Sequence, residues 1–139
     1  MLLFDTHVWI WTVEGDDRRI GPRARRVIAR AERDDEIRLA SATLFEIVAL
    51  HTAGRLRLSR PVDQWIHESL ELPGVRVAVL TTAAAVDAGY IPRDALADPL
   101  DRVLVATARQ LDAVFLTGDE QIIEYAKRTS NARVFDARQ

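Results

Sequence analysis

The first eleven residues, MLLFDTHVWIW (1–11), place one acidic residue between two apolar segments. Residues 1–4 form a short apolar run that is typical of a buried strand, and residues 6–13 are compatible with a short helix. A buried charge is costly unless a partner compensates it. Asp5 therefore either caps the helix that follows it, where Asp is a preferred residue, or holds a positively charged group.

Strand-like and helix-like segments alternate along the rest of the chain. Further apolar runs that are typical of buried strands lie at 37–40, 75–79, 113–117 and 133–135. Helix-like stretches separate them, at 21–35, 41–54, 61–71, 81–91, 98–111 and 119–128. Strands that alternate with helices indicate parallel strands joined by right-handed crossovers. We therefore predict one α/β domain over residues 1–139, in which helices form layers on both sides of a mostly parallel sheet of four or five strands.

Composition limits the class of protein. The chain has 139 residues, 48% of them apolar, which is enough for a hydrophobic core, and its net charge of −2 provides no overall basic field for nucleic acid. Cysteine is absent, which excludes disulfides and thiolate chemistry and predicts a cytoplasmic location. No signal peptide is recognisable at the start, and no apolar run approaches the ~18 residues that a membrane span needs.

Two further acidic residues lie at element ends. Asp119 follows the fourth predicted strand as Asp5 follows the first, and the carboxyl ends of parallel strands are where ligands bind. Asp119 could equally cap the next helix. Asp98 stands before Pro99, which is typical of an N-cap followed by proline at the first helical position.

Two more acidic residues lie on helical faces that we expect to point inward. Asp101 is in the first turn of its helix, where the helix dipole favours a carboxylate, and it shares a stripe with Leu104, Ala108 and Leu111. Glu46 has a structural alternative, because its spacing from Thr43 fits a capping box. Its helical face also holds Ala42, Ala49, Leu50 and Ala53.

The joint placement of Asp5, Glu46, Asp101 and Asp119 argues for a function. In a parallel α/β fold these four carboxylates would meet at one edge of the sheet, repel one another and raise one another's pKa. A bound divalent cation removes that conflict, and ligands that are all oxygen suit Mg²⁺ or Mn²⁺. A metal site of this kind fits phosphodiester hydrolysis.

Four segments in this order resemble the PIN-domain ribonucleases, and most closely the VapC toxins of bacterial toxin–antitoxin pairs. They are LLFDTHVWIW (2–11), SATLFEIVALHTAGRL (41–56), DPLDRVLVATA (98–108) and LTGD (116–119). The resemblance covers nearly the whole chain. It implies a PIN-like fold and Mg²⁺- or Mn²⁺-dependent endoribonuclease activity on RNA, often tRNA or another structured RNA. It also implies a cognate antitoxin and a homodimer, and no membrane partner.

The resemblance also assigns roles to residues. Asp5, Glu46, Asp101 and Asp119 correspond to the acidic quartet of the family and would be both catalytic and metal-binding. Asp98 is an additional acid, and we favour Asp101 as the closer ligand because of its stripe. Thr117 matches the hydroxyl residue of a T-x-D turn and would bind water or phosphate.

Other side chains are less specific. Arg55, Arg57 and Arg60 follow the Glu46 helix and are our preferred RNA-binding residues, whereas the arginines at 23, 26, 30 and 33 have acidic neighbours that favour a solvated face. His7 could touch the site. Trp9, Trp11 and Trp65 could stack on bases, but we expect them to pack in the core or at a partner interface.

The sequence offers three other functions. A haloacid-dehalogenase phosphatase needs a second Asp two residues after the first, and this chain has His7 there, which disfavours that activity. A receiver domain needs a lysine late in the chain. The single lysine, Lys127, lies in the middle of a predicted helix and fits that role poorly. The serious alternative is a catalytically silent PIN-like module that binds protein or RNA, in which the acidic residues only cap helices.

Overall fold

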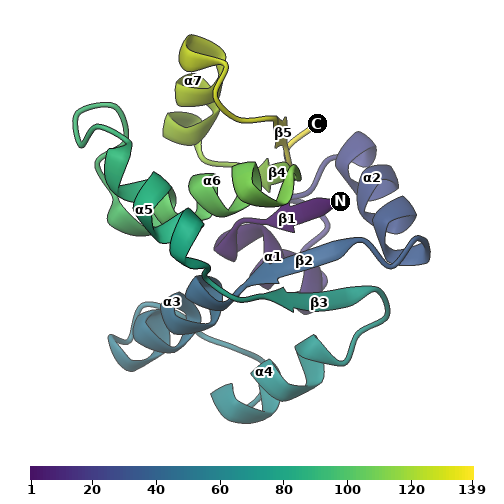
Figure 1. Ribbon diagram of the computed structural model, residues 1–139. Coiled ribbons are helices and arrows are strands. Elements are labelled where there is room, and N and C mark those ends of the chain that lie inside the picture. The colour runs from purple at the N-terminus through teal and green to yellow at the C-terminus, as the bar shows by residue number, and fades with distance from the viewer.

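The computed structural model describes residues 1–139 and contains one five-stranded sheet with helices on both faces (Figure 1). The strands are β1 (Leu2–Phe4), β2 (Ile37–Ala40), β3 (Val75–Ala78), β4 (Val114–Thr117) and β5 (Val134–Asp136). They pair in the order β3-β2-β1-β4-β5, and every neighbouring pair is parallel. The predicted fold class is confirmed, and each strand lies within two residues of its expected place.

Seven helices connect and cover the strands. They are α1 (Thr6–Glu14), α2 (Pro22–Arg33), α3 (Ser41–Thr52), α4 (Val62–Leu70), α5 (Thr82–Tyr90), α6 (Pro99–Leu111) and α7 (Glu120–Thr129). No helix is both long enough and apolar enough to cross a membrane.

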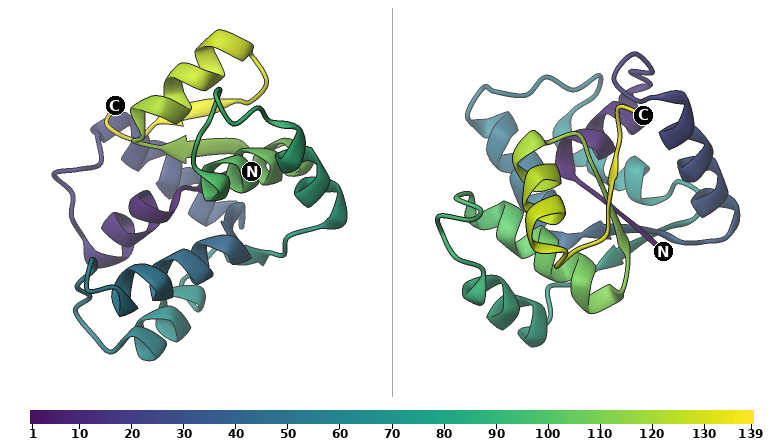
Figure 2. Two further views of the ribbon diagram at one scale, coloured as in Figure 1. Left: turned by 90° about the vertical axis from the view of Figure 1, so that its left-hand side faces the viewer. Right: turned by 90° about the horizontal axis from the view of Figure 1, so that it is seen from above.

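The core has two halves, because successive strand residues point to opposite faces of a sheet. Leu2 and Phe4 pack on one face with apolar side chains of α1, α2 and α4, among them Trp9 and Trp65. On the other face, Leu3 packs with side chains of α6 and α7. Figure 2 shows these layers from two further directions, with α5 packed outside α6.

The order in which strands are added to the sheet reverses between β1 and β4. From β1 it moves outward through β2 and β3, and it returns to the other side of β1 to form β4 and β5. Asp5 follows β1 directly, and its backbone N–H donates to the carbonyl of Leu116 in β4 at 2.9 Å. Ligands of open parallel sheets bind at such a switch point, beyond the carboxyl ends of the strands.

Helix α3 differs from its predicted form in two respects. Its N-cap is Ala40, without a side-chain hydrogen bond, so the capping box of Thr43 and Glu46 does not form. The Thr43 hydroxyl is buried and accepts a hydrogen bond from that of Thr6, at 3.2 Å. The expected apolar stripe is also wrong: Thr43 and Ile47 are buried, Glu46 is half-buried, and the predicted stripe members Ala49 and Ala53 are exposed.

A smaller correction concerns Pro61. We expected it in the first turn of its helix, but α4 begins at Val62 and Pro61 is the N-cap residue.

Candidate active site

Asp5 is the most buried acidic residue at the switch point, with 7% of its surface exposed. One carboxylate oxygen accepts the backbone N–H of Thr6 at 2.8 Å, which makes Asp5 the N-cap of α1. The other accepts the hydroxyl of Thr117 at 2.5 Å. Burial raises the pKa of Asp5, and the charge of Glu46 raises it further, against the opposing effect of these hydrogen bonds and of His7.

Thr117 joins the two strand-end acids. It is the last residue of β4 and is fully buried, and its hydroxyl also accepts the backbone N–H of Asp119 at 3.0 Å. We expected Thr117 to bind water or phosphate. That role stays a prediction; in the structure the hydroxyl is buried and donates its proton to Asp5. These two hydrogen bonds also fix the orientation of the Asp5 carboxylate relative to Asp119.

Asp119 and Asp98 begin helices, as their sequence context predicts. The side chain of Asp119 accepts the N–H of Gln121 at 2.8 Å at the start of α7. That of Asp98 accepts the N–H of Leu100 at 2.9 Å at the start of α6, with Pro99 as the first helical residue. Each of these bonds uses one carboxylate oxygen and leaves the other free.

Asp101 shows that the acids lie close enough to interact. It is half-buried in the first turn of α6, one turn before the buried Leu104. Burial raises the pKa of Asp101 to about 8, and the charges of Asp98, Asp5, Asp119 and Glu46 add to the effect in that order. The structure therefore brings all five predicted acids into one electrostatic cluster.

This acid cluster, defined as Asp5, Glu46, Asp98, Asp101 and Asp119, has no cationic partner in the protein. Salt bridges are frequent elsewhere on the surface, but none joins a member of the cluster to a Lys, Arg or His side chain. Several carboxylates that share a site without a cation repel one another. The donor set, which is entirely oxygen, suits Mg²⁺ or Mn²⁺.

The cluster is open rather than a closed cage. No three of its side chains converge closely enough to enclose an ion as they lie in the structure. Mg²⁺ usually keeps several waters and takes only one or two carboxylates directly. An open group of unpaired acids fits that mode of binding, with the remaining acids acting through water.

Comparison with known proteins identifies the family. The profile of the PIN domain matches residues 2–128, which is most of the chain. The chain belongs to the PIN-domain family. The resemblance on which the sequence analysis relied is therefore confirmed.

Relatives of this PIN domain include VapC proteins. Ribonuclease VapC22 of Mycobacterium tuberculosis is 30% identical over 121 residues, covering 87% of this chain and 88% of that protein. VapBC2 from Rickettsia felis, bound to a DNA fragment from its promoter, has a TM-score of 0.69 at 13% identity, covering 97% of both chains. DNA-bound VapBC from Salmonella typhimurium has a TM-score of 0.65 at 20% identity, covering 97% of this chain and 96% of that one. The two structures show that the fold is shared.

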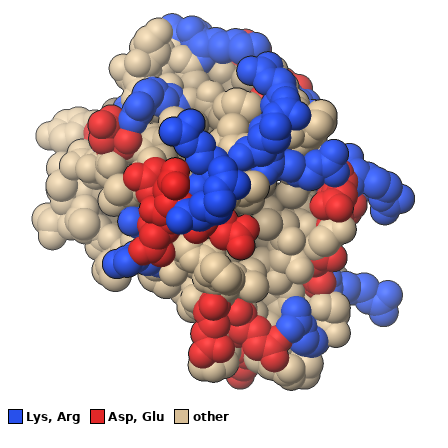
Figure 3. Space-filling model, turned by 90° about the vertical axis from the view of Figure 1, so that its right-hand side faces the viewer, with Lys and Arg blue, Asp and Glu red and all other residues tan.

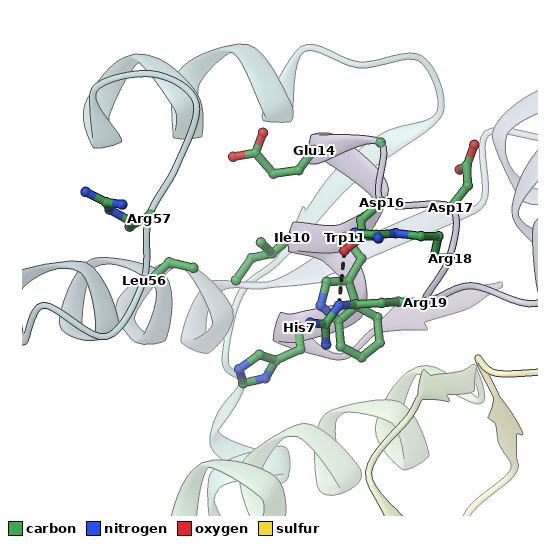
Figure 4. A pocket seen from close by; sticks show the side chains of 11 residues that line it. His7, Ile10, Trp11, Glu14, Asp16, Asp17, Arg18, Arg19, Leu56 and Arg57 are labelled. Atoms are coloured by element: carbon green, nitrogen blue, oxygen red, sulfur yellow. Dashed lines mark hydrogen bonds and ion pairs between the residues drawn. The ribbon is translucent and has the colours of Figure 1, made fainter.

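The three predicted RNA-binding arginines lie apart in this PIN domain. Arg57 lines a groove beside α1, on the opposite side of it from His7 and Trp11 (Figure 4). Arg60 forms a salt bridge with Glu68 of α4, and Arg55 is exposed. Of these three arginines, Arg57 lines the groove that also holds His7 and Trp11.

The arginines of α2 lie on the side of the PIN domain that Figure 3 presents, where acidic and basic side chains alternate. Arg30 pairs with Asp34 one turn further along, at 3.6 Å. This mixed surface agrees with the solvated face that the sequence favours over a phosphate-binding stripe.

Trp11 and His7 are candidate residues to which the sequence gives only a minor role. Trp9 and Trp65 are buried in the core as expected, but Trp11 is half-buried and faces the groove. His7 is exposed, and its ring centroid lies 6.3 Å from that of Trp11. Their i, i+4 spacing on one helix, directly after Asp5, is the sequence signal that pairs them.

Proposed function

We propose that this chain is a metal-dependent endoribonuclease, the toxin component of a toxin–antitoxin pair, which hydrolyses phosphodiester bonds in tRNA or another structured RNA. The observation that carries the proposal is the acid cluster: five carboxylates gathered at the switch point, none of which forms a salt bridge. Similarity to a protein named Ribonuclease VapC22 over most of the chain supports the same activity.

Each acid has a proposed role. Asp5, Asp101 and Asp119 would hold Mg²⁺, for which Mn²⁺ would substitute, and Asp98 would assist Asp101. When bound, the cation would neutralise the cluster and polarise the scissile phosphate. Glu46 is half-buried and forms no ion pair. It would orient a water molecule for attack on the scissile phosphate and would accept a proton from that water. The leaving oxygen then takes a proton from solvent, and no covalent enzyme intermediate is needed.

Incubation of the purified chain with total RNA tests this function. Parallel reactions contain Mg²⁺, Mn²⁺ or EDTA, and a second set uses Asp5→Asn. We expect discrete fragments only with the unaltered chain and a metal ion, because Asn has the shape of Asp without its charge. Sequencing the fragment ends would then identify the cleaved RNA.

A catalytically silent binding module is the alternative. It is favoured by the backbone hydrogen bonds that Asp5, Asp98 and Asp119 accept at the starts of three helices, which a purely structural role would also explain. Circular dichroism shows whether the protein is folded. If folded protein leaves the RNA intact in every reaction, the chain is not a ribonuclease and the binding module is the remaining function.

A cognate antitoxin is the proposed protein partner. The solved structures that share the fold carry the name VapBC, and so contain a second component beside VapC. An RNA substrate would place the protein in the cytoplasm, and that location remains a prediction.

A second copy of the chain is the proposed partner for an exposed apolar surface. Large apolar side chains stand out from α3 and α5, which Figure 1 shows on the same side of the molecule. Phe45 of α3 is 66% exposed and Tyr90 of α5 is 80% exposed. Val79 and Leu80, which follow β3, lie between these helices in the chain and are also exposed, and the Leu80 N–H donates to the Ser41 hydroxyl at the start of α3. Exposed apolar groups of this kind mark interaction sites.

Phe45→Glu is therefore expected to break the homodimer. Loss of a central aromatic contact costs about 2 kcal/mol or more, so the dissociation constant should rise at least ~30-fold. Sedimentation equilibrium measures this change, with Leu72→Glu as the control because Leu72 is exposed outside this surface. An unaltered chain that sediments as a monomer at high concentration would contradict the proposed dimer.

A further inference from the structure

A groove of about 760 Å³ lies beside the acid cluster, between α1, the segment 16–19 and the loop after α3 (Figure 4). Its lining includes His7, Trp11, Arg18, Arg19, Leu56 and Arg57. We propose that this groove binds a nucleotide next to the scissile phosphate of single-stranded RNA, with the base stacked on the pair formed by Trp11 and Arg19. The proposal rests on the proposed ribonuclease function and adds a base-binding subsite to it.

Trp11 connects the groove to the acid cluster. Its indole ring lies against Gly118, so closely that a Cβ added at Gly118 would be 3.4 Å from two ring atoms. Gly118 directly precedes Asp119, and His7 stands two residues after Asp5. A nucleotide held on Trp11 is therefore adjacent to both strand-end acids.

The side chains around Trp11 suit a nucleobase. The Arg19 guanidinium lies 5.4 Å from the centroid of the indole ring, and Figure 4 shows the two side chains next to each other. Bases of single-stranded RNA stack on aromatic rings and on arginine planes alike. Arg19 is held only by a salt bridge to Asp16 at the surface, which contributes little to stability. It can therefore adjust its position to a bound base.

The groove is lined by three acidic residues, Glu14, Asp16 and Asp17, and by three arginines, Arg18, Arg19 and Arg57. The acidic lining residues are partly occupied: Glu14 accepts the N–H of Ser59 at 2.8 Å, and Asp16 pairs with both Arg18 and Arg19. Arg57 is exposed and forms no salt bridge, so its guanidinium is available for a phosphate. Few of the lining residues are hydrophobic, which suits a stacked base with one or two phosphates better than an apolar peptide helix.

RNA binding by the non-cleaving Asp5→Asn chain tests the subsite. The probe is a short, end-labelled single-stranded RNA of mixed sequence, measured by fluorescence anisotropy in EDTA. Because loss of one base-stacking contact weakens binding by roughly 5- to 150-fold, Trp11→Ala in this background should reduce affinity about tenfold, and Trp11→Phe should retain most of it. Arg57→Gln should weaken binding by a smaller factor. Arg93→Gln, an exposed arginine outside the groove, should leave affinity unchanged.

An abasic ribose–phosphate strand of the same length separates stacking from a folding defect. This strand should bind the Asp5→Asn chain more weakly than the RNA does, and Trp11→Ala should weaken its binding no further, since the base and the indole form one interaction. Equal losses for both strands, or no loss for either, would overturn the subsite.

Cleavage of total RNA by the chain with Asp5 intact is scored in parallel. If that chain cleaves RNA and Trp11→Ala cleaves it with unchanged KM, the subsite is overturned while the ribonuclease stands, and the groove is left to a protein partner. If the chain neither cleaves nor binds RNA, the subsite and the ribonuclease fail together.

Discussion

Asp101→Asn is expected to abolish RNA cleavage and at the same time to make the metal-free protein more stable. The two effects have one cause. Burial and four neighbouring carboxylates raise the pKa of Asp101 to about 8. The negative charge of Asp101 is therefore unfavourable in the folded protein when no cation is bound. Asn keeps the shape of the side chain and removes that charge.

The two effects have different sizes. Loss of groups that only support metal ligands costs about 10–100-fold, so loss of a ligand should lower kcat/KM by more than ~100-fold. Solvent reaches part of the Asp101 carboxylate and screens its charge, so we expect a stability gain of only about 1 kcal/mol, or a Tm higher by roughly 3–6 °C. Cleavage assays and differential scanning calorimetry in EDTA measure the two quantities.

Asp98→Asn is the matched control. Asn caps helices as well as Asp does, so this variant keeps the hydrogen bond to Leu100 and removes only the charge. If Asp101 is the closer ligand, Asp98→Asn should lower activity by about tenfold or less. A larger loss from Asp98→Asn than from Asp101→Asn would reverse the assignment. A fall in the Tm of metal-free Asp101→Asn would contradict the repulsion that we infer.

The sequence predicts the fold well because the local signals agree with one another. Apolar runs mark the five strands, and Asp98 with Pro99 marks the start of α6 by chemistry that depends on neighbouring residues alone. The stripe below Asp101 was also predicted correctly, since α6 packs along the sheet and buries Leu104 and Ala108.

The sequence fails where tertiary contacts decide. The face of α3 was predicted from alanines, whose small side chains provide little drive for burial, and the helix instead turns Thr43 and Ile47 inward. The partner of the Thr117 hydroxyl is 112 positions away in the sequence, and that of Thr43 is 37 away. No local pattern encodes such pairs, so the role of Thr117 in holding Asp5 became visible only in the folded structure.

The acid cluster also predicts that pH controls both stability and metal binding. Asp101 has a raised pKa in the folded protein and an ordinary one near 3.8 when unfolded. Between these values the folded state keeps a proton that the unfolded state has released. The free energy of unfolding of the metal-free protein must therefore fall as pH rises from about 4 to about 8. The raised pKa of Asp5 contributes in the same direction.

Mn²⁺ should reverse this trend. The cation binds the deprotonated carboxylates, so binding releases protons and its affinity rises with pH, by up to about tenfold per unit for each proton released. A ligand that binds only the folded state raises the Tm in proportion to RT ln(1 + [L]/Kd). The Tm increase at a fixed Mn²⁺ concentration should thus be small near pH 5 and larger near pH 8, as measured by differential scanning fluorimetry against EDTA.

Asp101→Asn shows whether this pH dependence belongs to the cluster. Asp136 also has a shifted pKa, but its pKa is lowered by Arg138, so it affects stability only at pH values below the ordinary range of Asp. The slope between about pH 4 and pH 8 is therefore assigned to Asp101 and Asp5, and Asp101→Asn should flatten it and weaken the Mn²⁺ response. If the slope is unchanged in that variant, Asp101 does not cause it. If Mn²⁺ raises the Tm equally at both ends of the range, the carboxylates do not bind the ion. Asp5, Asp98 and Asp119 would then act only as helix caps, as a silent binding module requires.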